Sequence, residues 1–160
     1  MKKTAKNLKT LKTLSVMDRI LLLRQVPMFS GLSPDDLERI AEIAEEQLFL
    51  DQSLLCREGE HGDTLFVITS GKVDVITGAG KQETVLATRG IGDFVGEMAI
   101  LESAPRSATL KARGTVRVLV INGNTFKTIL LDRPEVAVSA LRQMSKKIRE
   151  LNQQVDTTGS

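Results

Sequence analysis

The spacing of apolar residues divides the chain into a helical part, an extended part and a second helical part. From Ser15 to Gln25 apolar residues recur at helical spacing, and Pro27 ends this helix because the residue before a proline avoids the α region. A second helix opens at Ser33, its N-cap, with Pro34 at the first position and Asp36 completing a capping-box pattern. Its expected buried stripe is Leu37, Ile40, Ala41 and Ala44.

Between Leu48 and Ile121 the pattern changes to short β-rich runs separated by turns that contain glycine. The runs are LFL, LLC, TLFVIT, KVDVIT, TVLAT, SATLKA and TVRVLVI. Ten of the twelve glycines lie between Gly59 and Gly123, as frequent turns between strands require. This spacing predicts a β-sandwich or a β-barrel.

Helical periodicity returns after Asn122. The pattern predicts a short helix from Thr125 to Leu131 and a longer one from Pro134 to about Gln154. Apolar residues of the longer helix are spaced four and three apart, which fits either an amphipathic helix packed on its own domain or a seam between two copies of the chain. They are Ala137, Leu141, Met144, Ile148, Leu151 and Val155.

Length and composition are those of a globular domain with its own core, since the chain has 160 residues and is 41% hydrophobic. The single cysteine, Cys56, cannot form an internal disulfide, which fits a reducing compartment. No apolar run approaches the roughly 18 residues of a membrane span, and the start lacks a signal peptide. We therefore expect a soluble cytoplasmic protein, or a domain at the cytosolic face of a membrane protein.

The net charge of +2 is unevenly distributed. Residues 1–14 contain five lysines and no acid, a charge of +5, so the remainder sums to −3. This stretch is predicted to be a solvated flexible arm, and contact with an anionic membrane or nucleic acid stays open as the alternative. Its lysines are Lys2, Lys3, Lys6, Lys9 and Lys12, and Leu8, Leu11 and Leu14 would let it continue into the first helix.

The chemistry of the chain is concentrated in the segment FVGEMAILESAPRSAT, Phe94 to Thr109, here called the cassette. Gly96 has no Cβ and permits close approach to the backbone, and the apolar run that follows can form one helical turn. Arg106 can donate two parallel hydrogen bonds to phosphate oxygens. Glu97 would repel a phosphate and suits a sugar hydroxyl. The two charges predict a ligand with an anionic end and a hydroxyl end.

The cassette resembles the phosphate-binding cassette of cyclic-nucleotide-binding domains, through F-x-G-E-[LM]-A-x-L followed by P-R-[STA]-A-T. The likeness extends through EGEHGDTLFVITSGKVDV, Glu58 to Val75, and covers roughly Pro27 to Leu151. It implies an α+β fold, an eight-stranded jelly roll with N-terminal helices, a short cassette helix, and C-terminal hinge and lid helices. It also implies a non-catalytic sensor for cAMP, with cGMP as the alternative, that passes binding on to those helices.

The patterns and the resemblance together divide the chain into five parts. These are the arm at 1–14, the N-terminal helical segment at 15–47, the β-roll at 48–121, the hinge and lid helices at 122–155, and a frayed or linker-like tail at 156–160.

The resemblance also implies roles for individual residues. Arg106 would bind the phosphate with Ser107 as a second contact, and Glu97 would bind the ribose. Backbone groups or close packing would come from Gly96, Met98, Ala99 and Ala108.

Some residue of the last helix has to cover the base. The chain has no Trp or Tyr, and no Phe beyond Phe126, so the cover must be aliphatic or cationic. The candidates are Leu141, Met144 and Ile148, with Arg142 or Arg149 stacking through the guanidinium plane.

Catalytic and metal sites are not predicted. His61 is the only histidine, so with Cys56 it forms no metal cluster of the usual spacing, and no G-x-S-x-G motif is present. We expect no enzymatic activity and no cofactor.

Only 39 residues follow Ile121, too few for both a lid helix and an appended DNA-binding unit, so no nucleic-acid partner is expected. The sequence favours a regulatory domain attached to an effector, in an assembly that could be membrane-associated, with a homodimer through the last helix as an open option. The alternatives are a jelly-roll interaction module that no longer binds nucleotide, or a fragment of a transcription regulator.

Overall fold

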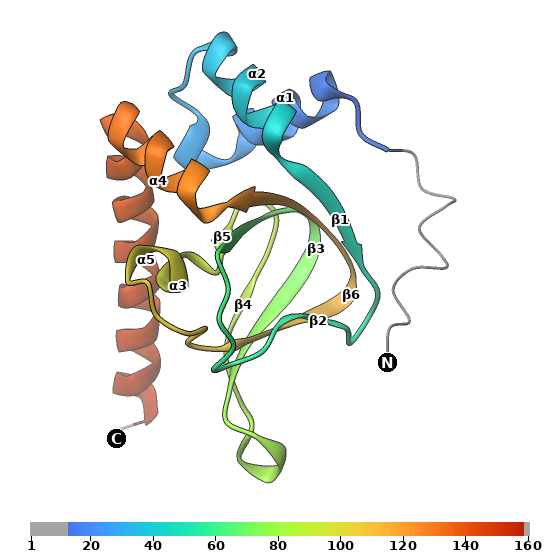
Figure 1. Cartoon of the computed structure of the whole chain (residues 1–160). Coiled ribbons are helices and arrows are strands. Elements are labelled where there is room, and N and C mark those ends of the chain that lie inside the picture. The colour runs from blue at the N-terminus through green and yellow to red at the C-terminus, as the bar shows by residue number, and fades with distance from the viewer. Residues whose placement is uncertain (1–12, 159–160) are drawn as a thin grey trace.

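The computed structural model describes residues 13–158, in which a sheet is flanked by helices from both ends of the chain (Figure 1). Residues 1–12, with the five lysines of the predicted arm, lie outside the described residues. The elements are α1 Val16–Gln25, η2 Pro27–Phe29, α2 Pro34–Ile43, β1 Glu45–Phe49, β2 Leu54–Cys56, β3 Thr64–Thr77, η3 Gly80–Gln82, β4 Thr84–Arg89, β5 Phe94–Val95, α3 Glu97–Leu101, β6 Thr109–Asn122, α4 Gly123–Asp132 and α5 Pro134–Thr158.

The described residues form one antiparallel sheet of six strands, paired in the order β1-β6-β3-β4, with β2 added to β6 and β5 to β3. The α+β fold is confirmed, but the strand count differs from the expected eight. TLFVIT and KVDVIT belong to one strand, β3, and the last four residues of SATLKA belong to β6 with TVRVLVI. Each long strand passes through a glycine with positive φ, Gly71 at 85° and Gly114 at 73°, so it turns without ending.

The sheet separates two hydrophobic cores. Successive side chains of a strand point to opposite faces, so Leu65 and Val67 of β3 face the helices while Phe66 and Ile68 face the inside of the roll. Strand β6 alternates in the same way. The helix-side core adds Phe94, Ile100, Phe126, Val136 and Ala140, and the inner core adds Phe49, Val73, Val95, Leu110 and Ala112.

Both N-terminal helices begin at a serine cap, of which only the one at Ser33 was predicted. Ser15 and Asp18 form a capping box on α1, and the Ser33 hydroxyl accepts the N–H of Asp36 at 3.2 Å on α2. Between the two helices, η2 buries Met28 and Phe29, a turn that the sequence analysis did not foresee. Strand β1 begins at Glu45, so the last residues of the predicted helical segment are extended. All four predicted stripe residues, Leu37, Ile40, Ala41 and Ala44, are buried.

The C-terminal helices are longer than predicted. Asn122 caps α4, its side chain accepting the N–H of Asn124 at 2.9 Å, so the helix starts two residues early at Gly123. Helix α5 continues to Thr158, and the predicted tail is therefore wrong for residues 156–158. Along residues 13–158, none of the helices is both long and apolar enough to cross a membrane.

Arg133 is the single residue between α4 and α5, and it attaches that corner to α2. Its Nε and Nη2 donate to the two carboxylate oxygens of Asp36, at 2.6 and 2.8 Å. The hydrogen bond from Arg133 holds the pKa of Asp36 below its ordinary value. An acidic side chain in the first turn of α2 thus also fixes the start of α5.

Replacing glycine with alanine is expected to lower the folding stability by different amounts at Gly71 and at Gly114. Gly71→Ala places a Cβ 2.4 Å from the Thr115 carbonyl oxygen and also strains the backbone, so it is expected to destabilise folding by at least about 3 kcal/mol. Gly114→Ala meets no atom within 4 Å and should cost only the backbone strain, about 1–2 kcal/mol. Urea unfolding of both variants measures the difference, and equal costs would contradict it.

Candidate ligand-binding site

Arg106 is held through its backbone by the turn that precedes β3. Its N–H donates to the Glu60 carbonyl at 2.8 Å, and its own carbonyl accepts the Gly59 N–H at 2.8 Å. Two segments that are far apart in the sequence, EGEHGDT and the cassette, are thus joined at this residue. These two hydrogen bonds give a structural reason why the resemblance to cyclic-nucleotide-binding domains includes the segment that begins at Glu58, upstream of the cassette.

The guanidinium of Arg106 is buried beside the N-terminus of the cassette helix α3, with only 5% of the residue exposed. Its Nη1 donates to the carbonyls of Thr64 and Gly96 at 3.0 and 3.1 Å, and its Nη2 donates to Thr64 Oγ1 at 3.0 Å. The ring of Phe66 lies 5.6 Å away, and Nε has no acceptor. Gly96 has a φ of 90°, and a Cβ there would lie 2.6 Å from Nη1, so this position requires glycine.

The charge of Arg106 has no carboxylate partner in residues 13–158, where every acceptor of the guanidinium is neutral. An uncompensated buried charge is costly, and a bound anion would relieve that cost. The site is therefore suited to an anionic group.

Glu97, the first residue of α3, is nearly as buried, with 9% exposed. Unlike Arg106 it has a charged partner, since the Lys147 ammonium of α5 lies 3.6 Å from Glu97 Oε1. Lys147 also donates to the Phe94 carbonyl at 2.9 Å and lies 4.4 Å from the centre of the Phe94 ring. Burial lowers the pKa of Lys147, and the Glu97 charge opposes that shift.

A cavity of about 460 Å³ opens between α3, β4 and α5. The structure brings all seven predicted cassette residues into its lining. They are Gly96, Glu97, Met98, Ala99, Arg106, Ser107 and Ala108. Ser107 is otherwise exposed, with its hydroxyl 3.6 Å from Met98 Sδ.

The last helix contributes only part of the predicted base cover. Met144 and Ile148 line the cavity, as does Leu151, whereas Leu141 and Arg142 do not. The cavity lies against the middle of α5, from Met144 to Leu151, while the first turns of the helix pack through Val136 and Ala140 on the helix-side core. For Leu141 and Arg142 the predicted location was therefore wrong. Arg149, the other stacking candidate, is exposed and lies outside the lining as well.

Several residues that line the cavity were not predicted from the sequence. Lys147 and Arg89 face the cavity, and Arg89 is paired with Glu150 of α5 at 3.0 Å. Lys147 lies among other basic residues of α5 and off the apolar seam, so nothing local distinguishes it. Only the packing of α5 against α3 reveals it.

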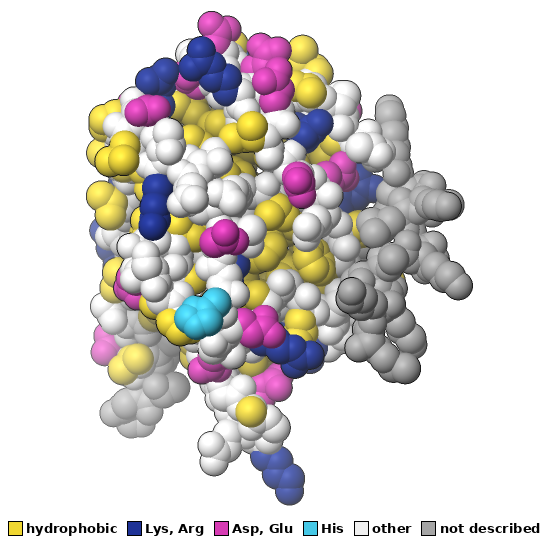
Figure 2. Space-filling view, in the orientation of Figure 1, with side chains coloured by type: hydrophobic (Ala, Val, Ile, Leu, Met, Phe, Trp, Pro, Cys, Tyr) yellow, Lys and Arg dark blue, Asp and Glu magenta, His cyan; other side chains and the backbone are white. Residues whose placement is uncertain are grey.

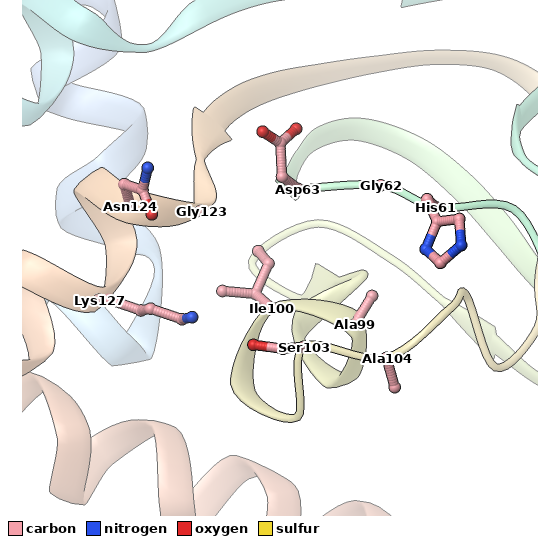
Figure 3. Close-up of a pocket in the computed structure, with 10 residues that line it drawn as sticks. All are labelled: His61, Gly62, Asp63, Ala99, Ile100, Ser103, Ala104, Gly123, Asn124 and Lys127. Atoms are coloured by element: carbon pink, nitrogen blue, oxygen red, sulfur yellow. The ribbon is translucent and has the colours of Figure 1, made fainter.

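A second pocket of about 420 Å³ lies on the other side of α3, beside α4 (Figure 3). Figure 3 shows Lys127 reaching from α4 toward Ile100 and Ser103, with Asp63 pointing away from them. His61 also lines this pocket, but neither Arg106 nor Glu97 does. In residues 13–158, no group of three or more His, Cys, Asp or Glu could hold a metal ion. The cavity lined by Arg106 is therefore the candidate site.

Comparison with known proteins agrees with this geometry. The chain is 32% identical over 108 residues to a cAMP-dependent protein kinase regulatory subunit of Colletotrichum orbiculare, a match that spans 68% of this chain and 27% of that protein. It is 34% identical over 116 residues to a cyclic nucleotide-gated potassium channel of Mesorhizobium japonicum, spanning 72% of this chain and 31% of the channel. The chain thus spans about a third or less of the length of these relatives.

The fold is likewise that of a solved cyclic nucleotide-binding domain from Methylobacillus flagellatus. The TM-score is 0.75 at 22% identity, with 89% of this chain and 83% of that one covered, a likeness that shows the fold alone. The sequence profile of the cyclic nucleotide-binding domain matches residues 46–133, more than half of the chain. With the cassette, the β-roll and this match in agreement, the chain belongs to the cyclic nucleotide-binding domain family.

Proposed function

We propose that this domain is a non-catalytic sensor that binds a cyclic nucleotide, cAMP in preference to cGMP. The observation that carries the proposal is the buried Arg106 guanidinium, which has no carboxylate partner in the described residues and lines a cavity of about 460 Å³. A cyclic phosphate diester bears one negative charge and would compensate that of Arg106. The ligand acts as a signal, so the proposal requires no metal or cofactor.

Three groups of lining residues would each contact one part of the nucleotide: the phosphate, the ribose or the purine. Arg106 takes the phosphate, with Ser107 beside it at the mouth of the cavity. Glu97 takes a ribose hydroxyl, since a carboxylate has about four lone-pair sites and one ammonium at 3.6 Å leaves others free. The purine would lie against an aliphatic wall formed by Leu86, Met144, Ile148 and Leu151.

Two ion pairs hold α5 beside the cavity that would receive this ligand. Lys147 with Glu97 and Arg89 with Glu150 both cross from α5 to the roll, one helical turn apart. The ligand would act through its different affinity for the docked and undocked positions of α5. Because Arg133 attaches the start of α5 to α2, such a movement would also be transmitted to the N-terminal helices.

The output requires an effector, which we infer to be an attached or interacting domain, as in the kinase regulatory subunit and the channel that this chain resembles. Apolar side chains stay exposed at the end of α4, where Leu131 is 82% exposed, and two turns into α5, where Leu141 is 64% exposed. Figure 2 shows hydrophobic side chains at the upper left, over α4. This surface, together with Leu141 of α5, supports contact with an effector or with a second copy. The homodimer and the cytoplasmic location stay predictions.

The direct test of the proposal is calorimetry with cAMP and cGMP. The unaltered protein is expected to bind both, with cAMP tighter by less than about a hundredfold, or roughly 2.7 kcal/mol. Arg106→Ala should lose about 2–5 kcal/mol of binding, a factor of roughly 30 to several thousand, because the phosphate loses its charged partner. Arg106→Lys should recover only part, since an ammonium lacks the bidentate geometry.

Two results would decide against the proposal. Absence of binding to either nucleotide would favour the alternative, an interaction module that has kept the cassette for structure. An Arg106→Ala protein that binds within threefold of the parent would remove Arg106 from the site.

If α5 covers the base, alanine substitutions along this helix should differ in their effect on cAMP affinity. Met144→Ala and Ile148→Ala should each weaken cAMP binding roughly fivefold, about 1 kcal/mol, because both shorten the aliphatic wall. Leu141→Ala is the matched control, since this residue lies on the same helix outside the cavity, and it should change affinity less than twofold. Equal effects of all three would show that the base does not contact α5.

Loss of the Lys147 ammonium is expected to lower the folding stability even when no nucleotide is bound. Lys147→Met should destabilise folding by about 2 kcal/mol because it leaves the Glu97 carboxylate buried and unpaired. The double variant Lys147→Met/Glu97→Gln should recover at least half of this loss. Urea unfolding of each, with the exposed neighbour substituted as Lys146→Met for control, checks the pairing. A double variant no more stable than Lys147→Met would refute it.

A further inference from the structure

We propose that Thr64 is a positioning residue for Arg106, and that Gly62 supplies the space in which the guanidinium lies. The inference rests on the proposed phosphate role of Arg106. Neither residue belongs to the cassette, and both lie more than forty positions before Arg106 in the sequence.

Thr64 offers two neutral acceptors to one guanidinium. Its carbonyl accepts Nη1 and its hydroxyl accepts Nη2, both at 3.0 Å, so the two terminal nitrogens are fixed by one residue. Gly96 O accepts Nη1 as well, which brings the occupied N–H groups to three of the five that an arginine has. The orientation of the plane is thus set, while the Nε–H stays without an acceptor.

The neutrality of these acceptors matters for binding an anion. A carboxylate in the place of the Thr64 hydroxyl would hold the guanidinium as firmly, but it would also cancel the charge that the phosphate needs. The neighbouring acid, Asp63, is exposed, and no ion pair joins it to Arg106 in the described residues. A threonine therefore orients Arg106 without neutralising it.

Thr64 is itself held by the sheet. It is the first residue of β3 and pairs with Asn122 of β6. Two positions on, and so on the same face of the strand, Phe66 lies 5.6 Å from the guanidinium. A binding group supported by a paired strand is more rigidly placed than one on a loop, and the Arg106 loop obtains this support from β3.

Gly62 has a different role, which is to leave a gap. A Cβ built on Gly62 would lie 2.4 Å from Arg106 Nε and 2.5 Å from Nη2. The φ of Gly62 is outside the positive range, so the backbone itself would accept alanine. The three atoms nearest to such a Cβ all belong to the guanidinium, which would have to move.

The test is cAMP binding by the full chain with Thr64→Val, which removes the hydroxyl while keeping the shape and a β-branched residue in the strand. Affinity is expected to fall about tenfold, because a hydrogen bond to a charged group is lost. Thr64→Ser restores the hydroxyl and should bind within threefold of the parent. The matched control is Thr69→Val on the same strand, where the hydroxyl donates to the Arg117 carbonyl at 3.2 Å, and it should change binding less than threefold.

A further measurement separates positioning from a structural role. In an Arg106→Lys background, Thr64→Val should cost less than threefold, because lysine has no second nitrogen for the hydroxyl to orient. Gly62→Ala is the second variant and leaves Thr64 intact. It should lower cAMP affinity at least tenfold while the thermal unfolding midpoint stays near that of the parent, since only a side-chain end has to move.

The inference is overturned if Thr64→Val and Gly62→Ala both bind cAMP within threefold of the parent. It is also overturned if Thr64→Val costs the same affinity in the parent and in the Arg106→Lys background. Failure of the unaltered protein to bind any cyclic nucleotide is a different result, which rejects the proposed function and this inference with it.

Discussion

The arrangement of the site depends on keeping one positive charge buried without a carboxylate partner. Arg106 is tolerated there because neutral acceptors satisfy both of its terminal nitrogens and an aromatic ring lies beneath it. Gly96 and Gly62 both leave room where a Cβ would collide with the guanidinium. The turn before β3, the start of β3 and the cassette are thus three separate segments shaped around one side chain, and their positions are fixed by the pairing of β3 with β6.

Local signals in the sequence were sufficient for the helices and the cassette. Ser33 with Pro34 predicted the start of α2, and the helical spacing of apolar residues from Leu37 to Ala44 predicted its buried face. Both signals are local, because caps and periodicity act within a few residues. The cassette was also found from local spacing, since its glycine, glutamate and arginine lie on one short segment. The strands were recognised as runs but counted wrongly, because a positive-φ glycine inside a long strand has the same signature as a turn between two short ones.

The features that the sequence did not predict all depend on contacts between distant segments. Lys147 has the same local surroundings as Lys146, and only the docking of α5 puts one of them beside Glu97 and leaves the other exposed. Leu141 shares the heptad spacing of Ile148, yet it lies two helical turns away, beyond the end of the cavity. Thr64 carries no mark of its role, since a threonine at the start of a strand is ordinary.

The alternation along β3 and β6 has a consequence for how such a domain can diverge. On each strand, residues that support the inside of the roll and residues that support the helices occupy neighbouring positions but belong to different cores. One set of side chains packs against the helices, and substitutions there change that packing; these are Leu65, Val67, Leu119 and Ile121. The other set fills the inside of the roll behind the cavity; these are Phe66, Ile68, Val116 and Val118. Substitutions in the first set therefore act first on the packing of the helices, and those in the second set act first on the ligand cavity, although the two sets alternate along the same few residues of backbone.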